Sequence, residues 1–176
     1  MIISVEQAKK EIADFKGWSD SKIERKLNAI EQAIRSYTHN NFQKRGIRAD
    51  CAVIAQNVYG EVLGLNVGDT IQITESQFND GLFVVEAIEG KMITVDKMLI
   101  DESHILVTKV EYPSDVVECA YDLLEWDLNH GNKVGVQSET ISRHSVTYFN
   151  MDGENSIMGY PKSLMGSLRP YMKARF

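Results

Sequence analysis

Histidine and cysteine are the residue types whose spacing would most directly reveal a metal site in this chain. The four histidines are His39, His104, His130 and His144, and the two cysteines are Cys51 and Cys119. No histidine lies three or four residues from another histidine or from a cysteine, as zinc ligands on one helix or loop would. The sequence therefore predicts no metal site. We expect isolated polar or capping histidines and two reduced, buried thiols.

Other residue spacings typical of catalytic and binding sites are incomplete or absent in the sequence. Asp96, Asp101 and Glu102 form the tightest acidic cluster outside the predicted helices, but they lack the D-x-D-x-D-G order of calcium loops. Neither a G-x-S-x-G elbow nor a G-x-x-x-x-G-K-S/T phosphate loop occurs. The glycines of 60–65 do not open a helix, as a dinucleotide fold requires. We therefore expect that the protein is not an enzyme and binds no cofactor. We expect the acidic cluster to lie in a solvated loop between two strands.

Charged side chains are distributed in blocks along the chain. The net charge of −6 divides into +3 for residues 1–45, −7 for 46–112, −6 for 113–154 and +4 for 155–176. Blocks of opposite sign indicate surfaces that meet different partners. No apolar run approaches the roughly 20 residues that a membrane span needs, and the first residues lack a signal-peptide pattern. The sequence predicts no membrane partner.

Helical periodicity occupies both ends of the chain. Ser4 and Gln7 form a capping-box pattern ahead of a first helix that Gly17 ends. A second predicted helix runs to about His39, and its apolar residues recur at helical spacing: Ile23, Leu27, Ile30, Ile34 and Tyr37. A third helix follows Pro113. Its apolar arc of roughly 160° is wide enough to contact two neighbouring elements.

Strand-like patterns fill the middle of the chain. Short strands are predicted over 70–74, 82–88, 92–95 and 105–110, with turns between them at 79–81 and 89–91. Strands this short and closely spaced are typical of a small antiparallel barrel or sandwich. Residues 51–63 give no clear pattern. The predicted fold class is therefore α+β, with a helical domain of 1–45 plus 113–176 interrupted by a β-rich module of 46–112.

The C-terminal third is predicted to have little stability of its own. Residues 134–149 have the pattern of a polar β-hairpin, and isolated hairpins are marginal in water. A helix is predicted over 161–174, but Gly166 and Pro170 lie inside it, and they cost roughly 1 and 3 kcal/mol relative to alanine. We expect both elements to become ordered only when a neighbouring molecule covers them.

Nucleic-acid binding through the β-barrel, or a regulatory role for it, is the alternative function. Such sites combine a positive groove with stacking aromatic side chains. The aromatic residues of the module are few, and it is the most acidic part of the chain. Phosphate repulsion therefore disfavours this alternative without removing it.

Several segments resemble one family, the head–tail connector (head-completion or adaptor) proteins of long-tailed bacteriophages and prophages. Residues 23–42 resemble the family's second helix and its exit. Residues 136–141 and 145–148 resemble its hairpin, V-x-S-E-x-I followed by S-V-T-Y, and 160–176 resembles its C-terminal helix. The turn at 79–85 resembles one found in small β-modules of phage structural proteins. Family members join the flanking helices by a shorter segment, so the role of the insert stays open.

The resemblance implies a structural virion protein with no enzymatic activity. It implies a ring of about twelve subunits that binds the portal protein and the stopper or tail-completion protein. The ring would line a channel for DNA, which passes without sequence-specific binding. The protein would lie at the head–tail interface of the virion, and in the host cytoplasm before assembly. Subunit or portal contacts are expected at Val136, Ser138, Glu139, Ile141, Val146, Tyr148, Tyr160, Leu164, Leu168, Arg169, Tyr171, Lys173, Arg175 and Phe176.

Overall fold

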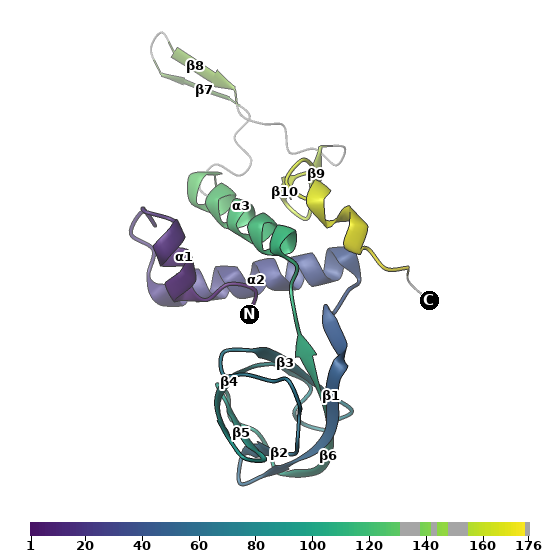
Figure 1. Ribbon diagram of the computed structural model, residues 1–176. Helices are drawn as coiled ribbons and strands as arrows, with labels where there is room; N and C mark the ends of the chain where they lie inside the picture. Colours follow the sequence, from purple (N-terminus) through teal and green to yellow (C-terminus); the bar gives the residue numbers. More distant parts are fainter. Residues whose placement is uncertain (131–137, 142–143, 148–154, 175–176) are drawn as a thin grey trace. The chain divides into compact units, whose positions relative to one another are not determined.

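The chain folds as two compact units (Figure 1). The computed structural model describes residues 1–130, 138–141, 144–147 and 155–174. One unit comprises Met1 and Asn41–Tyr112, and the other comprises Ile2–Asn40 and Pro113–Phe176. The second contains the α-helices, and the first contains a closed six-stranded antiparallel barrel. The predicted combination of helices with a small antiparallel barrel is confirmed.

The described residues of the helical unit contain three α-helices: α1 (Val5–Glu11), α2 (Asp20–Thr38) and α3 (Ser114–His130). The capping box is present, since the Gln7 N–H donates to Ser4 Oγ and the Ser4 N–H donates to Gln7 Oε1. α1 ends earlier than predicted because Ile12 is extended. α2 ends where His39 adopts a left-handed φ of 50°. This conformation stops a helix.

The core of the helical unit lies between α2, α3 and the C-terminal segment. α2 buries the predicted stripe of Ile23, Leu27, Ile30 and Ile34. α3 packs against both α2 and the C-terminal segment, as its wide apolar arc predicted. Its buried side chains are Val116, Cys119, Ala120, Leu123, Leu124 and Leu128.

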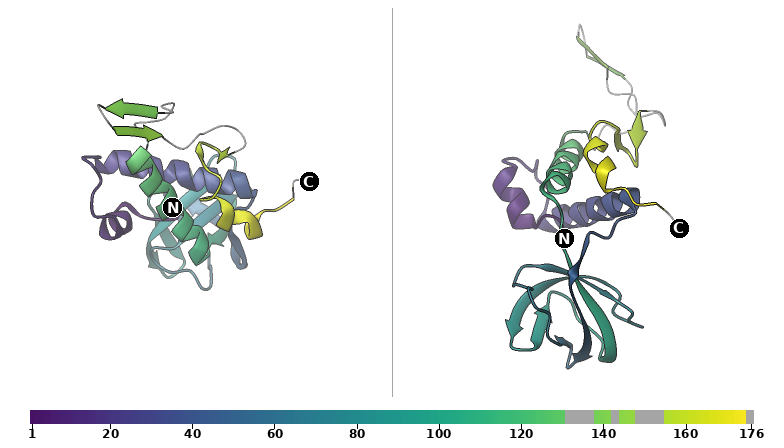
Figure 2. Two further views of the ribbon diagram at one scale, coloured as in Figure 1. Left: turned by 90° about the horizontal axis from the view of Figure 1, so that it is seen from above. Right: turned by 45° about the vertical axis from the view of Figure 1, so that its right-hand side comes forward.

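The strands of this unit curve round into a closed barrel (Figure 2). Six strands close it in the order β1-β2-β5-β4-β3-β6, with β1 paired to β6. They are β1 (Gln43–Ile54), β2 (Asn57–Tyr59), β3 (Thr70–Thr74), β4 (Gly81–Glu89), β5 (Met92–Val95) and β6 (Glu102–Val110). Closure removes the unpaired edges of an open sheet. β1 escaped prediction because register shifts after Gln43 and after Cys51 interrupt its period of two.

The C-terminal part contains two small sheets and a short 3₁₀ helix. β7 (Ser138–Ile141) pairs with β8 (His144–Thr147), which places a hairpin within the predicted 134–149; the rest of that range lies outside the described residues. β9 (Ser156–Ile157) pairs with β10 (Tyr160–Pro161).

The α-helix predicted over 161–174 is wrong. Pro161 belongs to β10, and the only helix among the described residues of this range is the 3₁₀ helix η1 (Gly166–Tyr171). Pro170 has no N–H to donate to the carbonyl of Gly166, and its ring would clash there in an α-helix. The tighter 3₁₀ turn uses other donors, such as the N–H of Leu168 to the carbonyl of Met165.

Candidate interaction surfaces

Tyr160 is held inside the helical unit. Its hydroxyl donates to Asp127 Oδ2 at 2.8 Å, and Lys26 Nζ lies 3.1 Å from the same oxygen. Burial, together with the negative charge of Asp127, raises the pKa of Tyr160. The tyrosine therefore joins the β9–β10 segment to α3 as a neutral hydrogen-bond donor.

The segment after Tyr160 is docked on the helices by the chain itself. Leu168 is completely buried, and the Cys119 thiol donates to the carbonyl of Leu164 at 3.4 Å. The Tyr171 hydroxyl lies 2.7 and 2.8 Å from the two carboxylate oxygens of Asp115, and this hydrogen bond raises the pKa of Tyr171. The Lys173 N–H donates to the carbonyl of Thr38. Leu168 thus needs no neighbouring molecule to cover it.

The remaining contact residues expected from the sequence fall into three groups. Arg169 and Lys173 are exposed, and Ser138, Glu139, Ile141 and Val146 belong to the β7–β8 hairpin, where Glu139 is paired with Val146. Val136, Tyr148, Arg175 and Phe176 lie outside the described residues.

A cavity of about 420 Å³ lies beside η1. We name it the basic groove; its lining residues are Tyr37, Ile157, Lys162, Ser163, Met165, Gly166 and Arg169. Lys162 and Arg169 are exposed, and the described residues that line the cavity include no carboxylate. Of these lining residues, only Arg169 was expected from the sequence to contact a partner. The signal for Lys162 was the absence of acidic residues after 154.

Three loops meet at one end of the barrel, because strands that alternate in direction return every second connection to the same end. They are 55–56, 75–80 and 96–101. Asp101 joins the first loop to the third, since its carboxylate accepts hydrogen bonds from the N–H groups of Ala55 and Gln56 at 3.1 and 2.9 Å. Asn79 joins the second loop to the third by exchanging two hydrogen bonds with the backbone of Ile100.

Glu102 completes this network from the first residue of β6. Its carboxylate accepts hydrogen bonds from Ser76 Oγ at 2.5 Å, the Gln77 N–H at 2.7 Å and Asn79 Nδ2 at 3.1 Å. These bonds, led by that from Ser76, lower the pKa of Glu102. Asp96 and Asp101 lie exposed in the loop between β5 and β6, as expected, whereas Glu102 belongs to β6 itself. Asp101 and Glu102 also have a structural role that was not expected. Both carboxylates hold loops together.

The joined loops present large apolar side chains to solvent. Ile54 and Ile100 are each 55% exposed, Phe78 is 63% exposed and Met98 is 82% exposed. We name these four residues the apolar tip. A hollow lined by Ala55, Gln56, Met98, Leu99, Ile100 and Asp101 lies beside them. Exposed apolar residues gathered on a fixed frame are typical of an interaction site.

The part of the chain that the structure describes contains no group of three His, Cys, Asp or Glu side chains able to hold a metal ion. Within the same residues, no helix is long and apolar enough to cross a membrane. The chain matches no protein-family model, and a search of curated proteins found no significant match.

Proposed function

We propose that this chain is a structural virion protein, a head–tail connector subunit that works in a ring between the portal and the stopper or tail of a long-tailed bacteriophage or prophage. The order of its elements supports the proposal. Two helices precede the insert, and a third helix, a hairpin and a docked C-terminal segment follow it. This order agrees with the segments that resemble the connector family.

The observation that carries the proposal is the separate sheet formed by β7 and β8. Among the described strands, these two pair only with each other. A two-stranded hairpin is marginally stable in water unless another surface supports it. In a ring, the adjacent subunit or the portal supplies that surface, so assembly and ordering of the hairpin are coupled.

A role as conduit also accords with the charge of the chain. Residues 41–112 carry six basic and eleven acidic side chains, and the whole chain carries a net charge of −6. Negative surfaces repel phosphates, so DNA passes a ring of such subunits without adhering to it.

Size-exclusion chromatography with light scattering tests the proposal. The full chain is run alone and with the portal protein of the phage that encodes it. We expect a complex that contains several copies of the chain per portal ring. A variant in which 138–147 is replaced by a Gly-Ser linker should lose this complex while its barrel keeps the wild-type unfolding transition. Failure of the intact chain to bind the portal would overturn the proposal.

Binding of nucleic acid through the barrel is the alternative, and its acidic surface makes it the weaker one. We expect no measurable affinity for duplex DNA in a fluorescence anisotropy titration at physiological salt. Tight binding that disappears when residues 41–112 are removed would establish the alternative instead.

A further inference from the structure

The apolar tip and the basic groove have complementary chemistry. The three loops that carry the tip hold four carboxylates, those of Glu75, Asp80, Asp96 and Asp101, and one basic side chain, that of Lys97. The groove combines the apolar side chains of Tyr37, Ile157 and Met165 with the cations of Lys162 and Arg169. Residues 155–174 contain no acidic side chain. Each surface thus offers apolar area surrounded by charge of the opposite sign to the other.

The tip is well suited to enter a cavity. Met98 is the most exposed of its four side chains, and the hydrogen bonds of Asp101, Asn79 and Glu102 fix the loops beneath it. A surface that is already ordered loses little conformational entropy when it binds. The groove volume of about 420 Å³ lies within the range of pockets that enclose small ligands.

We propose that the apolar tip of one copy of this chain binds the basic groove of a second copy. The inference rests on the proposed function, because it names the surfaces that join neighbouring subunits of the ring. Apolar side chains of the tip leave water for the apolar floor of the groove, while the tip carboxylates approach Lys162 and Arg169. The complementary charges favour this pairing over tip–tip and groove–groove contacts.

Such a contact is heterologous, because it uses two different surfaces of the chain. The resulting pair of copies still offers one free tip and one free groove, so association continues until a ring closes. A contact between identical patches would instead stop at a dimer. The second copy is also a better occupant than nucleic acid, whose phosphates the tip carboxylates would repel.

Two variants of the full chain, each lacking one surface, test the inference. Met98→Asp replaces the most exposed apolar side chain of the tip by a carboxylate that would have to lose its water on the apolar floor of the groove, and a partly exposed ion pair with the groove cations offsets little of this cost. Lys162→Glu with Arg169→Glu reverses the charge of the groove. All three residues are exposed, so both variants should fold, as circular dichroism and urea unfolding will verify. The two variants are mixed at about millimolar concentration, where weak contacts are populated. The mixture then retains one intact pair of surfaces, the groove of Met98→Asp and the tip of the groove variant.

Nuclear magnetic resonance locates the contact. With the Met98→Asp variant labelled by ¹⁵N and the groove variant unlabelled, we expect amide shifts around the groove, in 157–169 and at Tyr37. With the labels exchanged, the shifts should move to 54–56, 76–79 and 97–101. Light scattering of the mixture should show dimers and nothing larger, because neither end of the dimer can bind further.

Leu63→Asp is the matched control for the apolar tip. Leu63 is 77% exposed and lies in the connection 60–69, at the other end of the barrel from the tip. Because its tip is unchanged, unlabelled Leu63→Asp should cause the same amide shifts around the groove of labelled Met98→Asp as a chain with a wild-type tip does. Loss of those shifts in Leu63→Asp, or their absence from the mixture of tip and groove variants, would overturn the inference. The inference would also be wrong if the mixture gave no groove shifts while the wild type, but not Met98→Asp, bound phosphatidylcholine vesicles. The tip would then be a surface that binds lipid.

The portal experiment separates this inference from the proposed function. If the tip and groove variants show no mutual shifts but the wild type still assembles on the portal, only the tip–groove contact is wrong. If the shifts appear but no portal complex forms, the contact stands and the connector role fails.

Discussion

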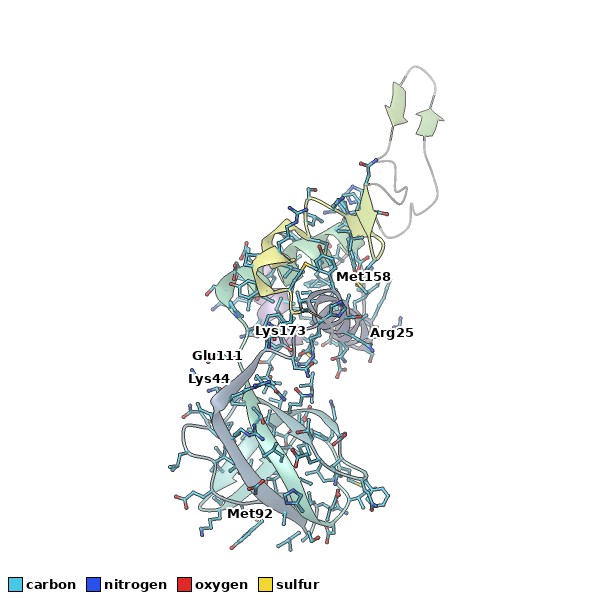
Figure 3. All side chains as sticks on the ribbon, turned by 90° about the vertical axis from the view of Figure 1, so that its right-hand side faces the viewer. Arg25, Lys44, Met92, Glu111, Met158 and Lys173 are labelled. Atoms are coloured by element: carbon cyan, nitrogen blue, oxygen red, sulfur yellow. The ribbon has the colours of Figure 1, made fainter. Side chains whose placement is uncertain are left out.

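The rings of Phe42 and Tyr112 lie with their centroids 5.0 Å apart, at the two points where the chain enters and leaves the barrel unit. Beside them, the Glu111 N–H donates to the carbonyl of Phe42 at 2.9 Å, and Lys44 Nζ forms an ion pair of 2.5 Å with Glu111 (Figure 3). The barrel is thus closed by its own residues.

This closure predicts that residues 41–112 fold when expressed alone. Their buried core contains thirteen hydrophobic side chains from all six strands and the loops between them. We expect dispersed amide resonances and one cooperative urea transition. Replacing 42–112 in the full chain by a short linker should likewise leave a folded helical unit. Loss of helical circular dichroism in that deletion would show that the helices depend on the barrel.

A close approach inside the barrel unit makes Gly60 sensitive to substitution. A Cβ atom at residue 60 would lie 2.4 Å from the buried Sγ of Cys51. We expect Gly60→Ala to destabilise the barrel by about 1–3 kcal/mol in urea unfolding, as overpacking does. Part of this loss should be recovered in the background of Cys51→Ala, which removes the sulfur. Gly46→Ala, where a Cβ would meet nothing within 4 Å, is the control and should be nearly neutral. Simple additivity of Gly60→Ala and Cys51→Ala would contradict the proposed steric cause.

The periodicity of apolar residues predicted those helices and strands whose structure depends mainly on residues close together in the sequence. α2 shows this, since its buried side chains recur at helical spacing, as does β3, where polar and apolar residues alternate. β1 could not be predicted in the same way, because its register shifts depend on pairing with β6, which lies about fifty residues further along the chain.

The interaction surfaces were hidden for a related reason. The apolar tip collects Ile54 from the end of β1 and Phe78 and Met98 from two separate loops, and nothing in the sequence marks them as neighbours until the barrel closes. The acidic cluster was visible as a cluster, but the hydrogen-bond partners of Glu102 lie 23–26 residues away. Residue type alone therefore could not show whether this carboxylate is solvated or holds a loop in place.

Glu102 predicts a pH dependence of barrel stability. Its pKa is lowered in the folded state, so its contribution is fully present above the ordinary glutamate pKa and is lost as pH falls through the folded value. The free energy of unfolding of the barrel should therefore decline as pH falls from about 5, through the ordinary glutamate pKa and on through the lower folded value, and Glu102→Gln should reduce that slope. The same substitution should destabilise the barrel at neutral pH. Glu61→Gln, at an exposed carboxylate of the 60–69 connection, is the control and should leave the slope unchanged.

Asp127 predicts unequal effects of two substitutions in the helical unit. Tyr160→Phe removes one donor but leaves Lys26 beside the carboxylate, so we expect a loss of about 1 kcal/mol. Asp127→Ala removes the acceptor and leaves the buried Tyr160 hydroxyl without it, which should cost about 1–3 kcal/mol. Thermal or urea unfolding of the helical unit gives both values. Equal losses for the two variants would mean that the hydroxyl finds another acceptor.

Cys119 reports on the docking of the C-terminal segment. Its thiol is buried, burial is the main cause of its raised pKa, and its Sγ donates to the carbonyl of Leu164. A thiol reagent can reach it only when this segment lifts away from α3. Because η1 is a single short 3₁₀ helix containing Pro170, we expect this opening to require less free energy than unfolding of the helical unit.

The measurement is the labelling rate of Cys119 in a Cys51→Ala variant at low denaturant, converted to an opening free energy. An opening free energy equal to that of global unfolding would mean that the segment moves only with the whole unit. A smaller one should rise when the portal protein is added, because a ligand that binds only the docked form stabilises it. A rise in the opening free energy would mean that assembly stabilises the docked C-terminal segment. An unchanged value would mean that the segment opens equally often before and after assembly.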